Sequence, residues 1–252
     1  MDLQRLLSLI RSAVDGYGMI EEGDRIAVGV SGGKDSLALL TGLAALREFY
    51  PKRFGLTAIT VDMGFETPTD LSPVKEYCQK LGVKYEVIPT NIYKIVFETR
   101  KEPNPCSLCA KMRRGALDRA AAALGSGKLA LGHHADDVID TFMLNLLYGG
   151  SISTFSPVTR LDRSGITLIR PMILVWEKEL SGFIKRAALP VIKSPCPADK
   201  NTSREDVKNL IRSLEKDNRD LKAKLYGAIV RGGVSGFVPR KRKNGKAQGG
   251  DL

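Results

Sequence analysis

Two cysteines stand three positions apart in the stretch NPCSLCAKMRRGAL, residues 104 to 117. Cys106 and Cys109 have the spacing at which two thiolates can bind one metal, because the chain turns between them. Arg113 and Arg114 follow closely. A guanidinium stays charged and cannot act as a base, so these arginines suit phosphate binding or the stabilisation of thiolate and sulfide. A solvated helix face is the alternative for the two arginines.

The other two cysteines of the chain differ in their surroundings. Cys78 lies in the helical pattern VKEYCQKLGV, where a small apolar residue of the core would serve as well. Cys196 lies between two prolines in KSPCPADK, a poor place for packing and a suitable one for a ligand. The candidate metal ligands are therefore Cys106, Cys109 and Cys196. Three thiolates would leave one iron of a [4Fe–4S] cluster open; a zinc site completed by Cys78 or water, and a metal-free persulfide pair, are the alternatives.

A second candidate site is the stretch SGGKDS, Ser31 to Ser36, which joins an expected strand to an expected helix. The first N–H groups of a helix and the positive end of its dipole hold phosphate oxygens. The glycines permit close approach of the backbone, the serines donate hydroxyl groups, and Lys34 adds charge. The stretch matches neither the Walker A pattern nor the dinucleotide pattern GxGxxG.

A third candidate is GHHADD, which places Asp136 and Asp137 just beyond an expected strand. Ligands of open α/β sheets bind at the carboxyl ends of strands. Carboxylates there can hold Mg²⁺ or accept a proton, and we expect Asp136 as a magnesium ligand and Asp137 as a catalytic group. The alternative for Asp136 is a helix cap.

The elements around these sites alternate between apolar runs and helical patterns, which predicts an α/β fold with an open, mostly parallel sheet and helices on both faces. The expected strands are 25–30, 55–62, 84–90, 128–134 and 166–172. The expected helices are 37–50, 70–82, 106–125, 135–150, 177–189 and 203–230.

The chain divides into four expected parts: an N-terminal helix (1–22), a nucleotide-binding domain that includes the CxxC helix (23–172), a small helical unit that carries Cys196 (173–230), and a basic tail (231–252). The tail holds six Lys or Arg and one Asp. Such a segment cannot bury enough apolar surface to stay ordered. Solubility and contact with nucleic-acid phosphates are equally good reasons for its charge.

The composition indicates the class of partner and the cellular compartment of the protein. The net charge of +11 over 252 residues is consistent with a polyanionic partner. No apolar stretch is long enough to span a membrane, and charges interrupt the apolar periodicity of the N-terminus, unlike a signal peptide. We therefore expect a cytoplasmic protein without membrane contact, whose thiols stay reduced.

The sequence SGGKDS resembles the PP-loop of the ATP pyrophosphatase superfamily, whose members cleave ATP between the α- and β-phosphates and have an adenine nucleotide α-hydrolase-like fold. The resemblance implies an adenine and ribose site at the end of the second strand, although Val61 and Met63 could equally be core and Asp62 a turn cap. By this resemblance the ATP-binding residues are Val30, Ser31, Gly32, Gly33, Lys34, Asp35, Ser36, Val61, Asp62, Met63, Gly132 and His133.

A narrower resemblance extends over roughly residues 24 to 215. The motifs SGGKDSLALL, PCSLCAKMRRGAL, LGHHADDVIDTFMLNLLYGG and SPCP follow one another as in the TtcA and TtuA group of tRNA thiolation enzymes, and look most like the TtcA branch of 2-thiocytidine synthetases. The chain lacks the terminal zinc-binding cysteines usual in the TtuA branch, and SPCPADK lacks a second cysteine often found there.

This resemblance implies ATP, Mg²⁺ and a [4Fe–4S] cluster as cofactors, and tRNA, a sulfide or persulfide donor and a second copy of the chain as partners. The implied reaction adenylates the C2 carbonyl oxygen of a tRNA base, with Lys34, Arg113 and Asp137 as catalytic residues, and then replaces that oxygen with sulfur. A PP-loop enzyme that modifies RNA without thiolation, and a metal-stabilised RNA-binding protein without catalysis, are the alternatives.

Overall fold

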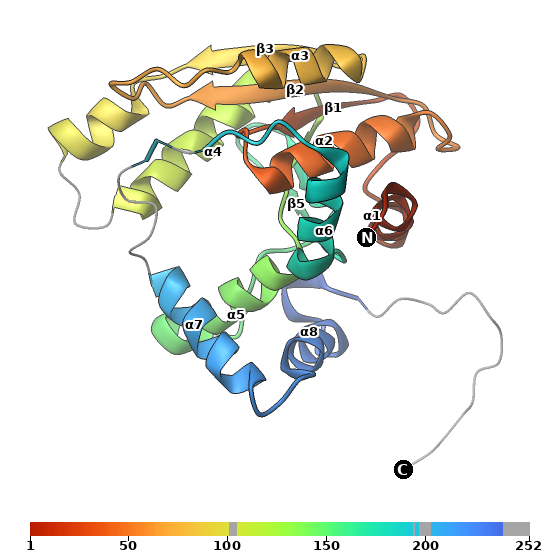
Figure 1. Ribbon diagram of the computed structural model, residues 1–252, viewed down its shortest axis with the longest axis vertical. Helices are drawn as coiled ribbons and strands as arrows, with labels where there is room; N and C mark the ends of the chain where they lie inside the picture. Colours follow the sequence, from red (N-terminus) through yellow and green to blue (C-terminus); the bar gives the residue numbers. More distant parts are fainter. Residues whose placement is uncertain (101–104, 194, 197–202, 239–252) are drawn as a thin grey trace.

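A six-stranded sheet forms the centre of the computed structural model, which describes residues 1–100, 105–193, 195–196 and 203–238 (Figure 1). The strand order is β3-β2-β1-β4-β6-β5, and every neighbouring pair is parallel except β5 and β6. The expected α/β class with a mostly parallel sheet is confirmed. The strands are β1 (Asp24–Gly29), β2 (Phe54–Asp62), β3 (Lys84–Pro89), β4 (Lys128–Ala130), β5 (Val158–Arg160) and β6 (Thr167–Ile169).

The helices follow the expected patterns with two differences. A π-helix, η1 (Lys94–Thr99), was not expected, and the stretch 203–230 forms two helices because the polar run 216–220 interrupts it. None of the described helices has both the length and the apolar character needed to cross a bilayer. The helices are α1 (Leu3–Tyr17), α2 (Lys34–Arg47), α3 (Ser72–Lys80), α4 (Pro105–Ala123), α5 (Ala135–Gly149), α6 (Glu177–Ala187), α7 (Ser203–Glu215), α8 (Leu221–Arg231) and the short 3₁₀ turn η2 (Val234–Gly236).

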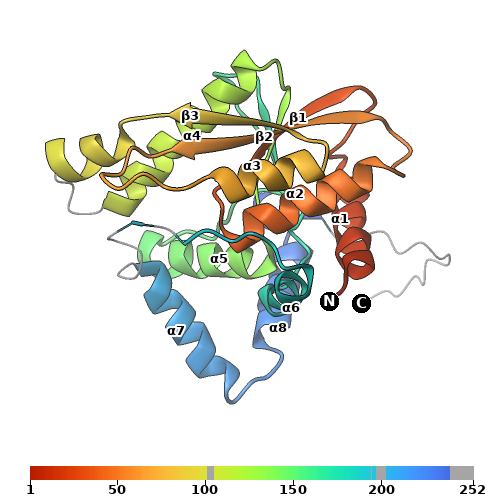
Figure 2. The same cartoon turned by 45° about the horizontal axis from the view of Figure 1, so that its top comes forward.

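Alternate side chains of the central strands enter two cores. Ile26 and Val28 of β1 belong to the larger core, with the buried residues of α1, α2 and α3, whereas Ala27 packs with Ala120 and Ala121 of α4 on the other face. This alternation is the two-residue period of a strand covered on both faces. Figure 2 shows α2 and α3 over one face of the sheet and α4 across the other. The carboxyl ends of the parallel strands are thereby held in one row.

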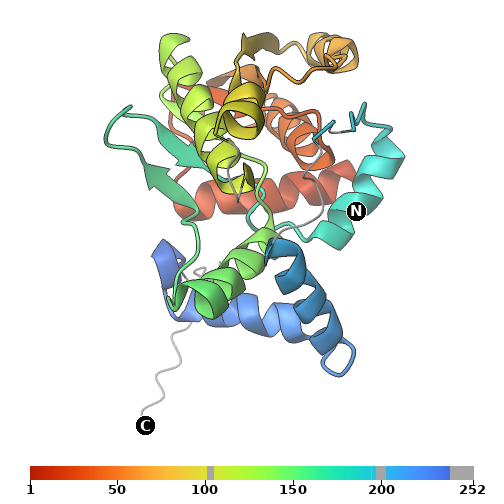
Figure 3. The same ribbon diagram turned by 90° about the vertical axis from the view of Figure 1, so that its left-hand side faces the viewer.

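The C-terminal helices do not form a separate core. In Figure 3, α5, α7 and α8 gather at one end of the molecule. Val207 and Ile211 of α7 pack on Ile139 of α5, which belongs to the expected nucleotide-binding domain. Ile229 of α8 shares the larger core with α2. The expected boundary at residue 173 is therefore crossed by continuous packing.

The start of the expected tail also packs against the core. Phe237 is 1% exposed, and its ring makes edge contacts with Tyr17 at 6.2 Å and Tyr226 at 5.9 Å between centroids. Burying a ring of this size stabilises the fold by about 2 kcal/mol, so Phe237 anchors this stretch to the core, although most of its neighbours are exposed. The basic tail was therefore expected to begin too early. Residues 239–252 lie outside the described part.

Gly64 is a backbone constraint at the carboxyl end of β2. Its φ is +69°, and a Cβ atom there would stand 2.4 Å from the carbonyl oxygen of Thr90. Gly165 has the same φ and no atom within 4 Å of such a Cβ. The two positions separate backbone strain from steric overlap.

We predict that Gly165→Ala lowers the free energy of unfolding by about 1 kcal/mol and Gly64→Ala by about 3 kcal/mol, because both pay for the left-handed conformation and only the second displaces a backbone oxygen. Urea unfolding of both variants measures the difference. Equal losses would show that the β2 and β3 ends can separate without cost.

Candidate active site

One pocket of about 670 Å³ opens at the carboxyl ends of β1, β2 and β4. This edge of a parallel sheet is where ligands of open α/β folds bind. It gathers most of the residues expected to act: the described lining includes the phosphate stretch, the end of β2, the CxxC helix, the start of α5 and the segment around Cys196. Among the expected site residues, those in the lining are Val30, Ser31, Gly33, Asp35, Ser36, Val61, Asp62, Met63, Cys106, Cys109, Arg113, Gly132, His133, Asp137 and Cys196.

The phosphate stretch closes on itself through its own serines. The backbone N–H of Ser31 donates to Ser36 Oγ at 3.1 Å, and Ser36 Oγ donates to the carbonyl oxygen of Gly33 at 2.9 Å. Gly33 precedes α2 and has no side chain to cap its first N–H groups. A preformed turn at an uncapped helix start suits a phosphate group.

Lys34 lies in this stretch but not in the described lining of the pocket. Its Nζ donates to Asp35 Oδ1 at 2.8 Å and to Glu177 Oε1 of α6 at 3.0 Å. Burial alone would lower the pKa of Lys34, but the hydrogen bonds and charges of the two carboxylates outweigh it and raise the pKa. The ammonium therefore ties α2 to α6 in this geometry.

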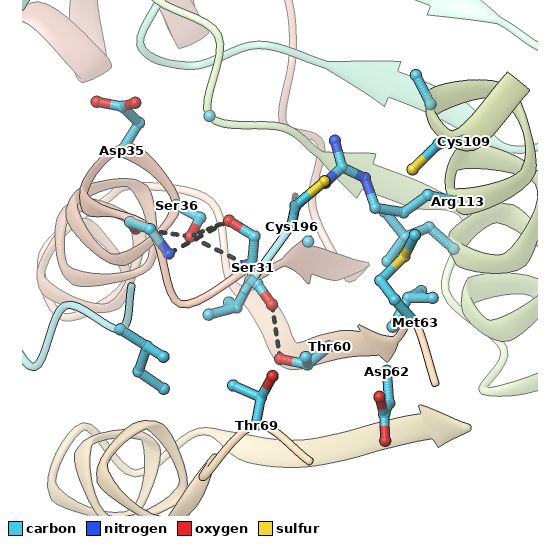
Figure 4. Close-up of a pocket in the computed structure, with 18 of the residues that line it drawn as sticks. Ser31, Asp35, Ser36, Thr60, Asp62, Met63, Thr69, Cys109, Arg113 and Cys196 are labelled. Atoms are coloured by element: carbon cyan, nitrogen blue, oxygen red, sulfur yellow. Dashed lines mark hydrogen bonds between the residues drawn. The ribbon is translucent and has the colours of Figure 1, made fainter. Parts of the chain in front are cut away.

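The carboxyl end of β2 also lines the pocket. Figure 4 shows Thr60, Asp62 and Met63 around the open space. Asp62 Oδ1 also accepts a hydrogen bond from the backbone N–H of Gly64 at 3.0 Å. Asp62 is thus both a pocket residue and the turn cap that was considered as its alternative.

Gly132 and His133 follow β4 and lie against the phosphate stretch. A Cβ atom at Gly132 would stand 3.2 Å from the backbone of Asp35 and Ser36, a tight contact, so glycine favours this approach. The ring of His133 packs on Phe155 at 4.8 Å between centroids, and the guanidinium of Arg170 covers Phe155 at 4.9 Å. Burial lowers the pKa of His133 to about 3, so the imidazole is neutral at neutral pH.

The acidic pair divides between two places. Asp137 lines the pocket, and its Oδ2 accepts the backbone N–H of His134 at 3.0 Å. Burial would raise the pKa of Asp137, but the contacts with His134, which include its backbone N–H, and the charge of Arg204 outweigh it and lower the pKa. A carboxylate held ionised in this way is a weak general base and a good ligand for cations.

Asp136, the expected magnesium ligand, is outside the described lining of this pocket. Its Oδ2 accepts the backbone N–H of Glu177 at 2.7 Å, and its Oδ1 lies 3.1 Å from Lys222 Nζ. Both oxygens are therefore engaged in the contact among α5, α6 and α8. This corrects the expectation for Asp136: because α5 is a helix, adjacent residues point in different directions, and only Asp137 faces the pocket.

The three expected thiol ligands all line the pocket. Cys106 and Cys109 come from the first turn of α4, and Cys196 comes from the segment that follows α6. In Figure 4, Cys196 points toward the guanidinium of Arg113, and Cys109 faces the same space. Burial raises the pKa of Cys109, and the charge of Arg113 partly offsets this. Within the described residues, no group of three His, Cys, Asp or Glu side chains already has the arrangement of a metal site.

A backbone contact places the Cys196 segment. The N–H of Ile192 donates to the carbonyl oxygen of Gly32 at 2.9 Å. The φ of Gly32 is +79°, and a Cβ atom there would stand 3.2 Å from Ile192 Cβ. The segment therefore rests directly on the phosphate stretch, which brings the third thiol into the pocket.

Sequence reasoning missed Ile192, Lys193 and Arg204, which line the pocket, and Glu177, which holds Lys34. None of them lies in a motif. Only Arg204 had a usable signal, since it stands at the start of a strongly amphipathic helix after the Cys196 segment.

We predict that Gly32→Ala frees the Cys196 segment, because a methyl group would push Ile192 away. The measurement is the rate of alkylation of Cys196 in the metal-free protein, followed by peptide mass spectrometry, and we expect an increase of several-fold.

Gly23→Ala is the matched control, since Gly23 has the same φ of +79° and no atom within 4 Å of an added Cβ. We expect the rate of Cys196 alkylation in Gly23→Ala to stay within twofold of the wild-type rate. Equal rates of Cys196 alkylation in the wild type, Gly32→Ala and Gly23→Ala would show that the contact of Ile192 with Gly32 does not hold the segment.

The model of the PP-loop domain family matches residues 4–215. The tRNA-cytidine(32) 2-sulfurtransferase of Pelobacter propionicus is 38% identical over 229 residues, which cover 90% of this chain and 85% of that protein. The enzyme of the same name from Dichelobacter nodosus is 39% identical over 233 residues, covering 90% and 86%.

A solved structure gives the same grouping. The U34-tRNA thiolase NcsA from Methanococcus maripaludis, solved with its [4Fe-4S] cluster, has a TM-score of 0.71 and 26% identity, covering 89% of this chain and 76% of that one. The family match, the identity over nine-tenths of the chain and the shared architecture agree with one another. The chain belongs to the PP-loop family and, within it, to the TtcA group of tRNA thiolation enzymes.

Proposed function

We propose that the protein is an ATP-dependent tRNA sulfurtransferase that replaces the C2 oxygen of a tRNA cytidine with sulfur. The observation that carries the proposal is that the phosphate stretch and three cysteines line one pocket. An enzyme that only adenylates would need the first set, and a metal-stabilised binding protein only the second. The names of the relatives support cytidine 32 as the target.

The first step is adenylation. The triphosphate of ATP lies on Ser31 to Ser36 at the start of α2, and the adenine and ribose lie against the end of β2. The O2 atom of the cytidine attacks the α-phosphorus, the bond to the β-phosphate oxygen breaks, and pyrophosphate leaves. A poor leaving oxygen thereby becomes part of AMP.

Two carboxylates of the pocket are suited to bind the cation that accompanies the phosphates of ATP. Asp137 is ionised and one of its oxygens accepts the N–H of His134, so the other can face a cation. Asp35 also lines the pocket. These two carboxylates, rather than Asp136, would hold Mg²⁺, which would supply positive charge beside the phosphates of ATP. His133 is neutral, so it can form hydrogen bonds in the lining of the pocket but does not act as an acid.

The second step replaces the oxygen. Sulfide attacks C2, and AMP leaves with the former O2 atom, so no net oxidation or reduction occurs. A persulfide carrier would first release its outer sulfur as sulfide, with a thiol as the two-electron reductant and a disulfide as the product. Cys106, Cys109 and Cys196 form an all-thiolate donor set that fits a [4Fe–4S] cluster, which would supply one iron without a protein ligand as a place to hold sulfide. Arg113 stands one helical turn after Cys109 and offsets the negative charge of thiolates and sulfide.

The substrate must present an accessible base, and the unpaired loops of a folded tRNA do so. The net charge of +11 supports binding of such a polyanion. Thiolate chemistry needs a reducing compartment, which supports a cytoplasmic setting. The sulfur donor and a homodimer remain predictions.

We predict that the protein, purified without oxygen and reconstituted, holds about four irons and four acid-labile sulfides per chain. Alanine at Cys106, Cys109 or Cys196 should remove most of both and abolish formation of 2-thiocytidine in tRNA. Cys78→Ala is the control, because the Cys78 side chain, on α3, is fully buried in the larger core.

Two results would contradict this assignment. Stoichiometric zinc without labile sulfide would replace the cluster by a structural site. Full thiolation activity in the cysteine variants would leave a PP-loop enzyme of another chemistry.

We predict that Asp137→Asn lowers kcat/KM for tRNA-dependent release of pyrophosphate by about 100-fold, because the amide keeps the hydrogen bond from His134 and loses the charge that faces the cation. The iron content should stay unchanged. Asp162→Asn, at an exposed position between β5 and β6, is the control. Wild-type rates in Asp137→Asn would remove Asp137 from the reaction.

A further inference from the structure

Arg204, in the first turn of α7, reaches the active-site pocket from the C-terminal helices. It belongs to none of the motifs that define the phosphate stretch, the acidic pair or the thiols. Its side chain is half-buried. A cationic side chain that a separate helix places in the lining of a pocket is suited to bind an anionic ligand.

The position of this guanidinium is set by packing and by one hydrogen bond. Val207 and Ile211 are each 1% exposed and fix α7 on Ile139 of α5. Nη2 of Arg204 donates to Thr141 Oγ1 at 2.9 Å. Thr141 stands one turn after Asp137 on α5, so it lies on the same side of the helix. The guanidinium is therefore preorganised beside the pocket carboxylate.

Within the part of the chain that the structure describes, the bond to Thr141 uses one of the five N–H donors of the guanidinium, which leaves the others for a ligand. The charge of Arg204 is close enough to contribute to the lowered pKa of both Asp137 and His133. His133 follows Gly132, which packs on the phosphate stretch, and Asp137 lines the same pocket. Arg204 is thus placed at the phosphate side of the pocket.

The pocket also needs this charge. ATP carries several negative charges, yet the Nζ of Lys34 is engaged by Asp35 and Glu177. Arg113 stands beside the cysteines (Figure 4), and Lys193 is exposed. Within the described lining, Arg204 is the cation that lies next to Asp137.

We propose that Arg204 binds the phosphates of ATP and that Thr141 orients it for this task. The C-terminal helices thereby complete the nucleotide site. This inference rests on the proposed function, because it takes ATP as the occupant of the pocket. A guanidinium there neutralises charge that develops as pyrophosphate leaves.

The test is binding of α,β-methylene-ATP with Mg²⁺ to the reconstituted full-length protein without tRNA, measured by calorimetry. Arg204→Met should raise the Kd about 10- to 100-fold, since it removes charged hydrogen bonds, and Arg204→Lys should restore part of the affinity. Thr141→Val keeps the charge and loses its orientation, so we expect an increase of a few-fold.

Arg212→Met is the matched control on the same helix, because the Arg212 side chain is 60% exposed and pairs with Glu205. Its Kd should stay within twofold of the wild type. Thermal unfolding checks that the variants fold. A wild type that does not bind the nucleotide would overturn the proposed function, whereas tight binding by both wild type and Arg204→Met would overturn only the role of Arg204.

Two further outcomes separate direct from indirect action. If Arg204→Met weakened tRNA binding and left nucleotide binding unchanged, Arg204 would contact RNA phosphate and the proposal would fail. If Arg204 acted only by keeping Asp137 ionised, its removal would have no added effect in an Asp137→Asn background. We expect the two substitutions to weaken nucleotide binding separately.

Discussion

The arrangement of the active site depends on the contact between the phosphate stretch and the segment that follows α6. The N–H of Ile192 reaches the carbonyl oxygen of Gly32, and the absence of a side chain at Gly32 permits this approach. The contact places Cys196 in the pocket that already holds the phosphate stretch and the CxxC helix. The residues that suit ATP and those that suit sulfur therefore share one space, and a base activated there need not move to meet sulfide.

Charge is distributed so that the scaffold and the pocket use different groups. Lys34 and Glu177 join α2 to α6, and the backbone of Glu177 joins α6 to Asp136, whose other oxygen meets Lys222 of α8. Partly exposed ion pairs of this kind contribute little each, but together they fix the helices around the pocket. Asp137 remains ionised at its edge. The adjacent acidic residues thus serve structure and chemistry separately.

The parallel sheet could be predicted from the sequence, because strands buried on both faces are continuously apolar and Gly-rich turns mark their ends. The phosphate stretch was equally visible, since its residue types and its position before a helix carry the chemistry. The surroundings of side chains were not visible: nothing local shows which of Asp136 and Asp137 faces the pocket, or that Lys34 meets Glu177. Residues such as Arg204 and Phe237 depend on contacts between distant segments, which composition and periodicity do not encode. The basic tail was expected to begin at residue 231 because of its charge content. The sequence pattern did not show that the single aromatic residue Phe237 packs into the core.

We infer that one pocket activates the C2 oxygen of a cytidine and then exchanges it for sulfur. The most direct measurement uses tRNA labelled with ¹⁸O at O2 of the target cytidine, incubated with the reconstituted protein, ATP and sulfide. We expect one ¹⁸O atom in the phosphate group of AMP for each 2-thiocytidine formed. Label in water or pyrophosphate, or unlabelled AMP beside thiolated tRNA, would contradict it.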